Sequence, residues 1–331
     1  MTVNPNSLQC WIVTEGMAGT ENQCIGVAES LGLEPVIKRV GLRQPWKSLS
    51  PWLGFENAGT FAPALTAPWP DILIAAGRKS IAASRYIKRM SGGKTLTVQL
   101  QDPRISPRHF DLVAVPEHDP TRGDNVIVTK GAPNRISEAR LARARSDFAP
   151  LFAMMPAPRV AVLLGGNSKA HTMSTSGMCK LGEQLSSLNA SLMITASRRT
   201  GEAEKQAFLE ALHASESSYP RWFWDGSGEN PYMGMLAWAD TILVTADSVS
   251  MISDAATAGK PVYMIPLDGG SRRFDSFHRN MIQYGALRPF EGALEHWNYP
   301  PLRDSDAIAA AIRTALESRT IGEKAANPLY P

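Results

Sequence analysis

Short apolar runs alternate with helix-like segments along most of the chain, and this alternation restricts the fold more than any other feature. In the first half, the predicted strands span residues 8–15, 34–40, 71–77, 95–101, 111–117 and 125–131, and the predicted helices span 21–32 and 80–90. Strands that alternate with helices predict a parallel sheet that is covered by helices on both faces.

The same pattern restarts after residues 147–159, a segment with three prolines through which a helix cannot run intact. Beyond it the predicted strands span 159–166, 191–197, 221–226, 241–247 and 261–267, and the predicted helices span 175–189, 201–215, 232–239 and 248–259. A length of 331 residues also exceeds what one hydrophobic core usually serves. We therefore predict two Rossmann-like, doubly wound α/β domains, residues 1–150 and 151–304, that face each other across a cleft.

Two segments stand outside this repeat. Residues 44–70 combine several prolines with large aromatic side chains, so we expect a long and mostly irregular excursion. Its aromatic residues would either pack as core or present an apolar surface to a membrane leaflet. A last predicted helix, residues 305–318, precedes a polar tail, and a return of the segment 305–331 to the first domain is one path open to it.

The composition and the motif content exclude several classes of protein. The net charge of +3 is dispersed along the chain, which argues against a nucleic-acid partner. The three cysteines lack the spacing of a disulfide framework or a zinc site, no apolar run approaches the ~18 residues of a spanning helix, and no signal-peptide pattern is present. No GxGxxG, GxxxxGK[ST], GxSxG or HExxH motif occurs. We expect a cytoplasmic protein.

Ligands of open parallel sheets bind beyond the carboxyl ends of the strands, so the residues that follow each strand are the candidates for a site. Three successive strand ends of the second domain carry groups suited to phosphate, namely glycines, arginines and helix starts. The first two supply Gly165, Gly166, Asn167, Ser197, Arg198, Arg199 and Thr200. A plain glycine turn and solvated arginines are the structural alternatives, and Thr200 is also placed to cap the next helix.

The third strand end is the hydroxyl-rich sequence TADSVS, in which a strand passes directly into a helix. Its candidates are Thr245, Asp247, Ser248 and Ser250, and Asn230 opens the short helix that precedes this strand. The first amides of a helix need hydrogen-bond partners. The two serines would either satisfy these amides themselves or share them with a ligand phosphate.

The candidates in the first domain also follow its predicted strands. The loop after the first strand carries Gly16, Gly19, Glu21 and Asn22, and it would either close over a substrate or form a helix start capped by Thr20.

A second group of candidates lies at other strand ends. His118 and Asp119 follow a strand, and a histidine beside a carboxylate suits a general base at neutral pH, although such a pair is also a common structural feature. Gln101 and Asp102 follow another strand of the same domain. In the second domain, Arg272 and Arg273 belong to a basic segment, residues 269–280, that would contact a phosphate or acceptor or form a solvated turn.

The stretch MISDAATAGKPV resembles the donor-nucleotide segment of glycosyltransferases of the GT-B fold, in which an acidic residue grips the ribose of a nucleotide sugar. The position that matches this acid is Asp254, one methylene shorter than the Glu of that segment. The whole chain, through GTENQCIGVAESLG, VQLQDPR, SRRTG and GENPYMGMLAWAD, more closely resembles a bacterial family named after a plant mitochondrial-fission factor. That family is often labelled a predicted nucleoside-diphosphate-sugar epimerase, and it implies a GT-B-like fold.

The resemblance implies transfer of a sugar from a nucleoside-diphosphate sugar, with the donor at the second domain and His118, Asp119 and Glu21 as catalytic candidates in the first. Arginines and helix N-termini would absorb the charge of the leaving group, so we expect neither a metal nor another cofactor. The acceptor is not identified, and a lipid-linked acceptor with peripheral contact at the inner membrane is one alternative. An epimerase on the same fold and a non-catalytic scaffold that binds a protein or a membrane are the rival hypotheses.

Overall fold

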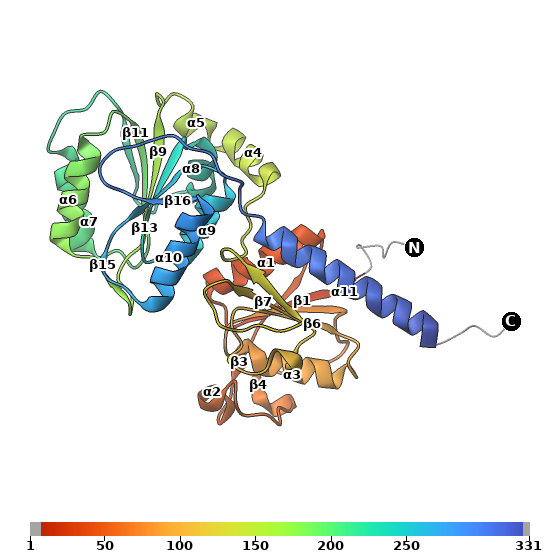
Figure 1. Ribbon diagram of the computed structural model, residues 1–331. Coiled ribbons are helices and arrows are strands. Elements are labelled where there is room, and N and C mark those ends of the chain that lie inside the picture. Colours follow the sequence, from red (N-terminus) through yellow and green to blue (C-terminus); the bar gives the residue numbers. More distant parts are fainter. Residues whose placement is uncertain (1–7, 327–331) are drawn as a thin grey trace. The chain divides into compact units, whose positions relative to one another are not determined.

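The computed structural model describes residues 8–326, without the side chains of 320–326, and its contacts divide the chain into two units. Unit 1 contains the described residues up to Arg135 and from Arg303, and unit 2 spans Ile136–Leu302. Each unit is a parallel sheet between layers of helices (Figure 1). The predicted α/β fold with two Rossmann-like units is confirmed.

The sheet of unit 1 has six parallel strands in the order β2-β1-β5-β6-β7-β8. These strands are β1 (Cys10–Thr14), β2 (Val36–Arg39), β5 (Ile72–Ala76), β6 (Leu96–Leu100), β7 (Leu112–Pro116) and β8 (Val126–Thr129), and a short η3 (Pro107–His109) precedes β7. Helices α1 (Ala18–Leu31) and α11 (Asp304–Ala326) share a core with one face of the sheet, and α3 (Ser80–Met90) packs on the other face.

Helix α11 belongs to unit 1, because its apolar side chains Ile308 and Ile312 are buried in the same core as Val27 of α1. The start of α11 is fixed by Asp304, whose carboxylate accepts hydrogen bonds from the backbone N–H of Lys130 (2.9 Å) and of Gly131 (2.8 Å). Helix α11 therefore packs against the first domain, which is the alternative that the sequence analysis left open for the C-terminal segment.

The excursion between β2 and β5 is mostly irregular, as predicted. It contains β3 (Gly41–Leu42), α2 (Trp46–Leu49), η2 (Ala58–Thr60) and β4 (Phe61–Ala62), and β3 pairs with β4 in an antiparallel fashion. Phe61 is buried against Tyr86 of α3, with ring centroids 5.1 Å apart, whereas Trp52 and Phe55 are exposed. The aromatic residues of this segment thus divide between core and surface.

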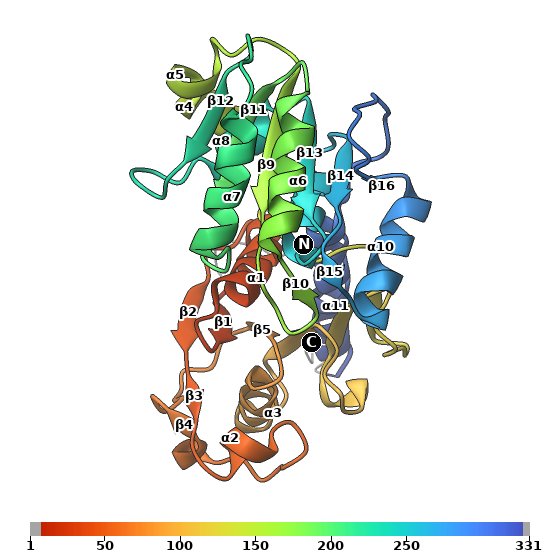
Figure 2. The ribbon, with the colours of Figure 1, turned by 90° about the vertical axis from the view of Figure 1, so that its left-hand side faces the viewer.

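The sheet of unit 2 has six parallel strands in the order β12-β11-β9-β13-β14-β16. The strands are β9 (Arg159–Leu164), β11 (Ser191–Ala196), β12 (Arg221–Trp224), β13 (Thr241–Thr245), β14 (Val262–Ile265) and β16 (Leu287–Pro289). Helices α6 (Thr175–Ser186) and α7 (Glu202–His213) cover one face (Figure 2), and α8 (Tyr232–Trp238), α9 (Val249–Thr257) and α10 (Arg272–Tyr284) cover the other (Figure 1). Side chains of β9 alternate between the two cores, with Val162 in one and Leu163 in the other.

The border between the units differs from the predicted border at residue 150. Residues 136–150 lie in unit 2, because α4 (Glu138–Asp147) packs against α8 and is followed by α5 (Ala149–Phe152). The indole of Trp238 donates a hydrogen bond to the carbonyl of Arg145 (2.9 Å), and the guanidinium of Arg145 donates one to the carbonyl of Ala237 (3.0 Å).

Most of the basic segment 269–280 is helical and belongs to α10, so the alternative of a solvated turn is wrong for this segment. Ser271 caps it by accepting a hydrogen bond from the N–H of Phe274, and Gly285 ends it with a φ of 88°. The apolar side chains of Phe277 and Met281, four residues apart, are fully buried in the core of unit 2. The arginines at the start of α10 lie on its exposed side.

Two glycines of α1 provide a test of how tightly this helix packs. A Cβ at Gly26 would lie 2.1 Å from the backbone oxygen of Asn134, whereas a Cβ at Gly19 would meet nothing within 4 Å. We therefore expect Gly26→Ala to lower the free energy of unfolding by about 1–3 kcal/mol, because the backbone at Asn134 must move. The control Gly19→Ala is expected to raise it by up to about 1 kcal/mol. Urea denaturation measures both changes, and equal effects would contradict the close packing of α1.

Candidate functional site

The carboxyl ends of β11, β9 and β13 lie side by side in unit 2. Ala196 pairs with Leu164, and Val244 pairs with Leu163, so the three strands end at nearly the same level. From β9 the chain proceeds outward through β11 and β12 and then returns to β13 on the other side of β9. This reversal is a topological switch point, the place where open α/β sheets bind their ligands.

The two glycines that follow β9 lie directly against the end of β13. The N–H of Gly165 donates a hydrogen bond to Oγ1 of Thr245 (2.7 Å), and the N–H of Gly166 donates one to Oδ2 of Asp247 (3.1 Å). A Cβ at Gly165 would lie 2.1 Å from Oδ1 of Asp247, and a Cβ at Gly166 would lie 2.2 Å from the carbonyl of Arg199. The close approach of three loops therefore requires glycine at both positions.

Asp247 is the link between these loops. Its side chain is inaccessible to solvent, and besides Gly166 it accepts hydrogen bonds from the hydroxyl of Thr245 (2.6 Å) and from Nη2 of Arg199 (2.7 Å). Three donors from three strand ends thus converge on one carboxylate. The predicted donor-binding residues Thr245 and Asp247 are brought together with Gly165, Gly166 and Arg199, and in the structure they bind one another.

The loop after β11 folds over the glycine turn. The hydroxyls of Ser197 (2.8 Å) and Thr200 both donate to the carbonyl of Gly165. Thr200 does not cap α7, because the residue at the cap position is Gly201. The side chain of Asn167 is also engaged, since its Oδ1 accepts from the N–H of Met173 (2.8 Å).

The other candidate side chains at this edge are those of Arg198, Ser248 and Ser250. The guanidinium of Arg198 is exposed and has no ion pair within the described part of the chain. Ser248 caps α9 by accepting a hydrogen bond from the N–H of Met251 (3.3 Å), which agrees with the capping alternative. The neighbouring Ser250 is partly buried.

Asp254 lies two turns into α9 and is held by a residue that the sequence did not suggest. The hydroxyl of Tyr232, the first residue of α8, donates a hydrogen bond of 2.9 Å to Oδ2 of Asp254. Burial raises the pKa of Asp254 to about 7, although the hydrogen bond from Tyr232 acts in the opposite direction. Burial and the nearby Asp254 charge raise the pKa of Tyr232 well above its usual value. Asn230 orients this tyrosine, because its Oδ1 accepts from the N–H of Tyr232 (3.0 Å).

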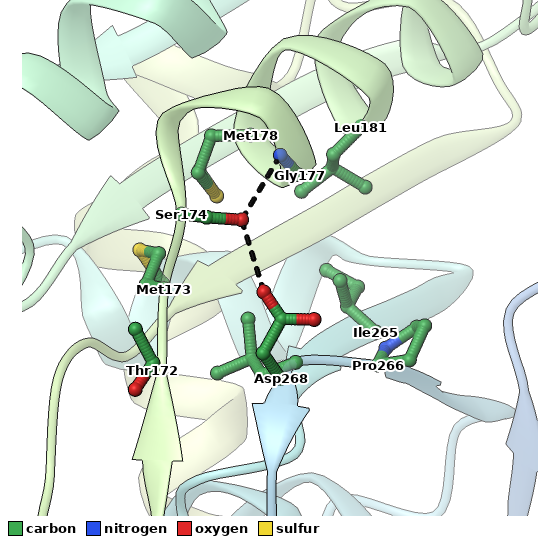
Figure 3. Close-up of a pocket in the computed structure, with 10 residues that line it drawn as sticks. Thr172, Met173, Ser174, Gly177, Met178, Leu181, Ile265, Pro266 and Asp268 are labelled. Carbon is green, nitrogen blue, oxygen red and sulfur yellow. Dashed lines mark hydrogen bonds between the residues drawn. The ribbon is translucent and has the colours of Figure 1, made fainter.

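A small cavity of about 50 Å³ lies at the start of α6, close to the end of β14 (Figure 3). Its floor is apolar, with Met178 and Leu181 among the lining residues, and its rim carries Ser174 and Asp268. The hydroxyl of Ser174 accepts from the N–H of Gly177 (3.3 Å) and donates to Oδ2 of Asp268 (3.1 Å), which uses the polar groups of the rim. No sequence signal indicated this cavity, since two short strands at its border, β10 (His171–Thr172) and β15 (Asp268–Gly269), lie outside the predicted strands.

Arg272 and Arg273 occupy the first turn of α10, just after β15, and both are exposed. They lie in the same unit as the three strand ends, in the segment that follows β14. Their predicted contact with a phosphate or an acceptor stays a prediction.

In unit 1 the loop after β1 is built around a helix start without a side-chain cap. Helix α1 begins at Ala18, and the predicted cap Thr20 instead donates its hydroxyl to the carbonyl of Met17 (2.9 Å). Gly16 has a φ of 85°, which favours glycine. Gly19 and Asn22 are exposed on the first turns of α1.

Glu21 lies on the same helix and forms an ion pair with Arg39 of β2. Two hydrogen bonds, of 2.9 and 2.6 Å, join the guanidinium to the two carboxylate oxygens. The hydrogen bond from Arg39 is the main reason that the pKa of Glu21 lies below its usual value. This carboxylate therefore stays charged at neutral pH.

The other predicted residues of unit 1 are spread over two strand ends. After β6, Gln101 donates its amide to Oε1 of Gln23 (3.0 Å), and Asp102 accepts from the hydroxyl of Thr121 (2.7 Å). After β7, Nε2 of His118 lies 3.8 Å from Oδ1 of Asp119, and only 2% of the histidine side chain is exposed. The catalytic assignment of His118, Asp119 and Glu21 stays a prediction.

The remaining titratable and apolar features are of structural interest. Cys10 and Cys24 are buried thiols, and burial raises the pKa of Cys10 to about 12. Within residues 8–326, no cluster of three His, Cys, Asp or Glu side chains has the arrangement of a metal site. Among the helices that the structure describes, none is both long enough and apolar enough to span a bilayer.

Comparison with solved structures identifies the fold of the chain. UDP-GlcNAc 2-epimerase from Methanocaldococcus jannaschii is 11% identical, with a TM-score of 0.55 over 94% of this chain and 99% of that chain. A second structure of that enzyme, in complex with UDP-GlcNAc and UDP, is also 11% identical and covers the same shares of both chains, with a TM-score of 0.52. These likenesses and the two parallel sheets define a protein of the GT-B fold.

Comparison of sequences then identifies the family. The family model described as mitochondrial fission ELM1 matches residues 18–316, and the chain belongs to that family. Mitochondrial fission protein ELM1 of Arabidopsis thaliana is 29% identical over 392 residues, which cover 93% of this chain and 91% of that protein. An uncharacterized protein of Rickettsia prowazekii (strain Madrid E) is 27% identical over 286 residues, which cover 75% of this chain and 80% of the relative. The predicted family resemblance is confirmed.

The raised pKa of Asp254 predicts a pH dependence of stability. Because the folded chain holds a proton on Asp254 between pH 3.8 and about 7, the contribution of this group to stability falls as the pH rises through that window. Asp254→Asn keeps the acceptor for Tyr232 and removes the charge. We therefore expect the variant to match the wild type near pH 4 and to be more stable at pH 8, as measured by urea denaturation.

Asp225→Asn is the control for this experiment. The hydroxyl and the N–H of Ser227 hold the pKa of the exposed Asp225 below its usual value, so this variant should lose stability at neutral pH instead of gaining it. A difference between wild type and Asp254→Asn that stays constant from pH 4 to pH 8 would contradict the burial of an ionisable Asp254.

Proposed function

We propose that this protein transfers a sugar from a nucleoside-diphosphate sugar and that it binds the donor at the carboxyl edge of the unit 2 sheet. The observation that carries the proposal is the convergence of three phosphate-suited strand ends at a switch point, with the Gly165–Gly166 turn between the β11 loop and the start of α9. The GT-B fold supports this assignment, since the structural relative with a TM-score of 0.52 was solved with UDP-GlcNAc and UDP.

The diphosphate would lie at the start of α9 and beside Arg198. The first four amides of a helix lack partners within the helix, and their partial positive charge favours an anion. Ser248 satisfies only one of these amides, that of Met251. Arg199 is held by Asp247, whereas Arg198 carries a guanidinium directed to solvent, so Arg198 is the side chain that we assign to the phosphate oxygens.

The ribose would lie near Asp254. Tyr232 engages Oδ2 of this carboxyl group, and the other oxygen, Oδ1, has no hydrogen bond among the described residues. A ribose hydroxyl can donate to that oxygen, and Tyr232 fixes the side chain in one orientation. We therefore assign Asp254 to ribose contact and Tyr232 to positioning.

Unit 1 would supply the acceptor site and the base. We propose the loop with Gly16, Gly19 and Asn22 for the acceptor, together with Gln101 and Asp102 after β6. His118 is proposed as the base because an imidazole nitrogen can accept a proton and return it, and Asp119, whose Oδ1 lies 3.8 Å from Nε2 of His118, would orient it. Glu21, which Arg39 keeps charged, would act electrostatically.

The proposed transfer needs no metal and no other cofactor. The leaving nucleoside diphosphate gains negative charge, and the amides of α9 together with Arg198 would stabilise that charge. Arg272 and Arg273 are the further cations of unit 2 that we propose for contact with a phosphate or with the acceptor.

A nucleotide-sugar epimerase is the second candidate, and the likeness to UDP-GlcNAc 2-epimerase favours it. An epimerase changes the sugar without any acceptor, whereas a transferase consumes the donor only when an acceptor is present. Incubation of UDP-GlcNAc with the protein alone, followed by NMR of the sugar, separates the two. A non-catalytic scaffold would either bind the nucleotide or not bind it, and in both cases the sugar would stay unchanged and the donor would not be consumed.

A lipid-linked acceptor and peripheral contact with a membrane complete the proposal. Such a protein would act in the cytoplasm at the inner membrane. The surface that we propose for this contact lies in unit 1.

Thermal unfolding against a panel of nucleotides and nucleotide sugars tests the donor site. A ligand at a hundred times its dissociation constant is expected to stabilise the wild type by about 2.7 kcal/mol. Asp254→Ala should lose most of this stabilisation, because it removes the ribose contact. Asp240→Ala, a carboxylate of unit 2 that lies before β13, serves as the control. A wild type that responds to no nucleotide would rule out the donor site.

Replacement of Arg198 tests the assignment of the diphosphate. We expect Arg198→Ala to weaken the binding of UDP by about tenfold while leaving the binding of uridine unchanged, because only UDP carries the phosphate charges. Isothermal titration at two salt concentrations measures both ligands. Arg143→Ala in α4 is the matched control of an exposed arginine. Equal losses for UDP and uridine would show that Arg198 does not contact the phosphates.

A further inference from the structure

Three large apolar side chains project from a short loop of unit 1, residues 43–55. Leu49 is 50% exposed, Trp52 is 62% exposed and Phe55 is 89% exposed. They lie within seven residues of one another, on and after α2. Figures 1 and 2 both place α2 at an extremity of unit 1, beyond α3. The loop therefore exposes three large apolar side chains, close together in sequence, at the end of the unit.

The backbone of this loop is fixed from beneath. The guanidinium of Arg85, on α3, donates to the carbonyls of Pro51 (2.8 Å) and Leu53 (2.6 Å), and the indole of Trp46 donates to the carbonyl of Gly54 (2.9 Å). The buried carboxylate of Glu56 is in turn paired with Arg85. These hydrogen bonds and this ion pair form a rigid frame for the backbone of the loop. The exposed apolar side chains are therefore attached to an ordered backbone.

The backbone of Phe55 has a conformation that bulky residues usually avoid, and the frame holds it there. Its φ is 60°, in the left-handed region that bulky residues avoid. Such a conformation persists only where the surroundings determine it, and it occurs mainly at sites of function. Here the anchored carbonyls on one side and the buried Glu56 on the other determine it.

The charged side chains of the loop 43–55 itself, Arg43 and Lys47, are both positive. Arg43 and Lys47 are exposed, and neither has an ion pair within the described residues. No Asp or Glu occurs from residue 43 to residue 55, and Glu56 is neutralised by Arg85. An apolar surface bordered by unpaired cations is complementary to anionic headgroups above an acyl layer.

We propose that the loop 43–55 is a docking surface for an anionic lipid bilayer, into whose interface Trp52, Phe55 and Leu49 insert. Indole and phenyl side chains suit the boundary between headgroups and acyl chains. The surface is small, with thirteen residues from 43 to 55, whereas a stable protein interface takes about 20–30 residues from each partner. The inference deepens the proposed membrane contact by naming its surface and its lipid chemistry.

Flotation of the full chain with vesicles tests the proposal. We expect the wild type to bind mixed phosphatidylcholine–phosphatidylglycerol vesicles, to bind phosphatidylcholine vesicles more weakly, and to lose affinity as salt is added. Phe55→Gly and Trp52→Ser should each weaken binding by roughly tenfold, because each removes one inserted aromatic side chain. Phe55→Gly suits the backbone conformation at this position, so it removes the side chain without strain.

Met154→Ser is the matched control, since Met154 is a 92% exposed apolar side chain of unit 2, and it should bind as the wild type does. Unchanged binding of Phe55→Gly and Trp52→Ser would overturn the proposal. So would a dimer in solution that these variants dissociate, because the loop would then bind a second copy of the chain. Stabilisation of the same variants by nucleotides reports separately on the donor site, so failure of one proposal is distinguishable from failure of the other.

Discussion

A single buried carboxylate holds the edge of the unit 2 sheet together. Asp247 accepts hydrogen bonds from the hydroxyl of Thr245, the N–H of Gly166 and the guanidinium of Arg199, and its side chain is inaccessible to solvent. A buried charge is costly unless it is paired and hydrogen-bonded, so these donors are committed to it. The glycine turn, the β11 loop and the start of α9 take their relative positions from this one group.

This commitment separates the residues that build the site from those that can meet a ligand. Thr245, Asp247 and Arg199 satisfy one another, and hydroxyls from the β11 loop close on the carbonyl of Gly165. A ligand would gain little by competing for groups that are already paired with one another. The groups left for recognition are the amides at the start of α9, the exposed Arg198 and the second oxygen of Asp254. A phosphate-suited composition thus predicts a site at this edge of the sheet without telling which residue would perform which task.

Apolar runs predict every strand of the two six-stranded sheets except β16, together with the strand ends that meet at the switch point, because burial on two faces leaves a plain signal in the sequence. The three residues of β16 are too few to leave such a signal. Helix α10 was missed because arginines dominate its start, although Phe277 and Met281 have the spacing of a buried helical face. The pairs β10–β15 and β3–β4 are two residues long, too short for any periodicity. The contact of Tyr232 with Asp254 joins positions 22 residues apart, and only the packing of α8 beside α9 brings them together.

Among the candidate residues of unit 2, Asp254 is the one whose presence is least explained by a contribution to folding stability. Unlike Asp247, it has one hydrogen-bond donor, the hydroxyl of Tyr232, and burial raises its pKa to about 7, so the fold disfavours its charged form. A ribose that donated hydroxyls to this carboxyl group would stabilise the charged form and lower the pKa again. In the folded chain the charged form of Asp254 therefore has few hydrogen-bond donors, and the ribose of a nucleotide can provide further ones. Such a deficit, in the unit whose sheet edge we propose as the donor site, supports the proposal that Asp254 contacts a ligand.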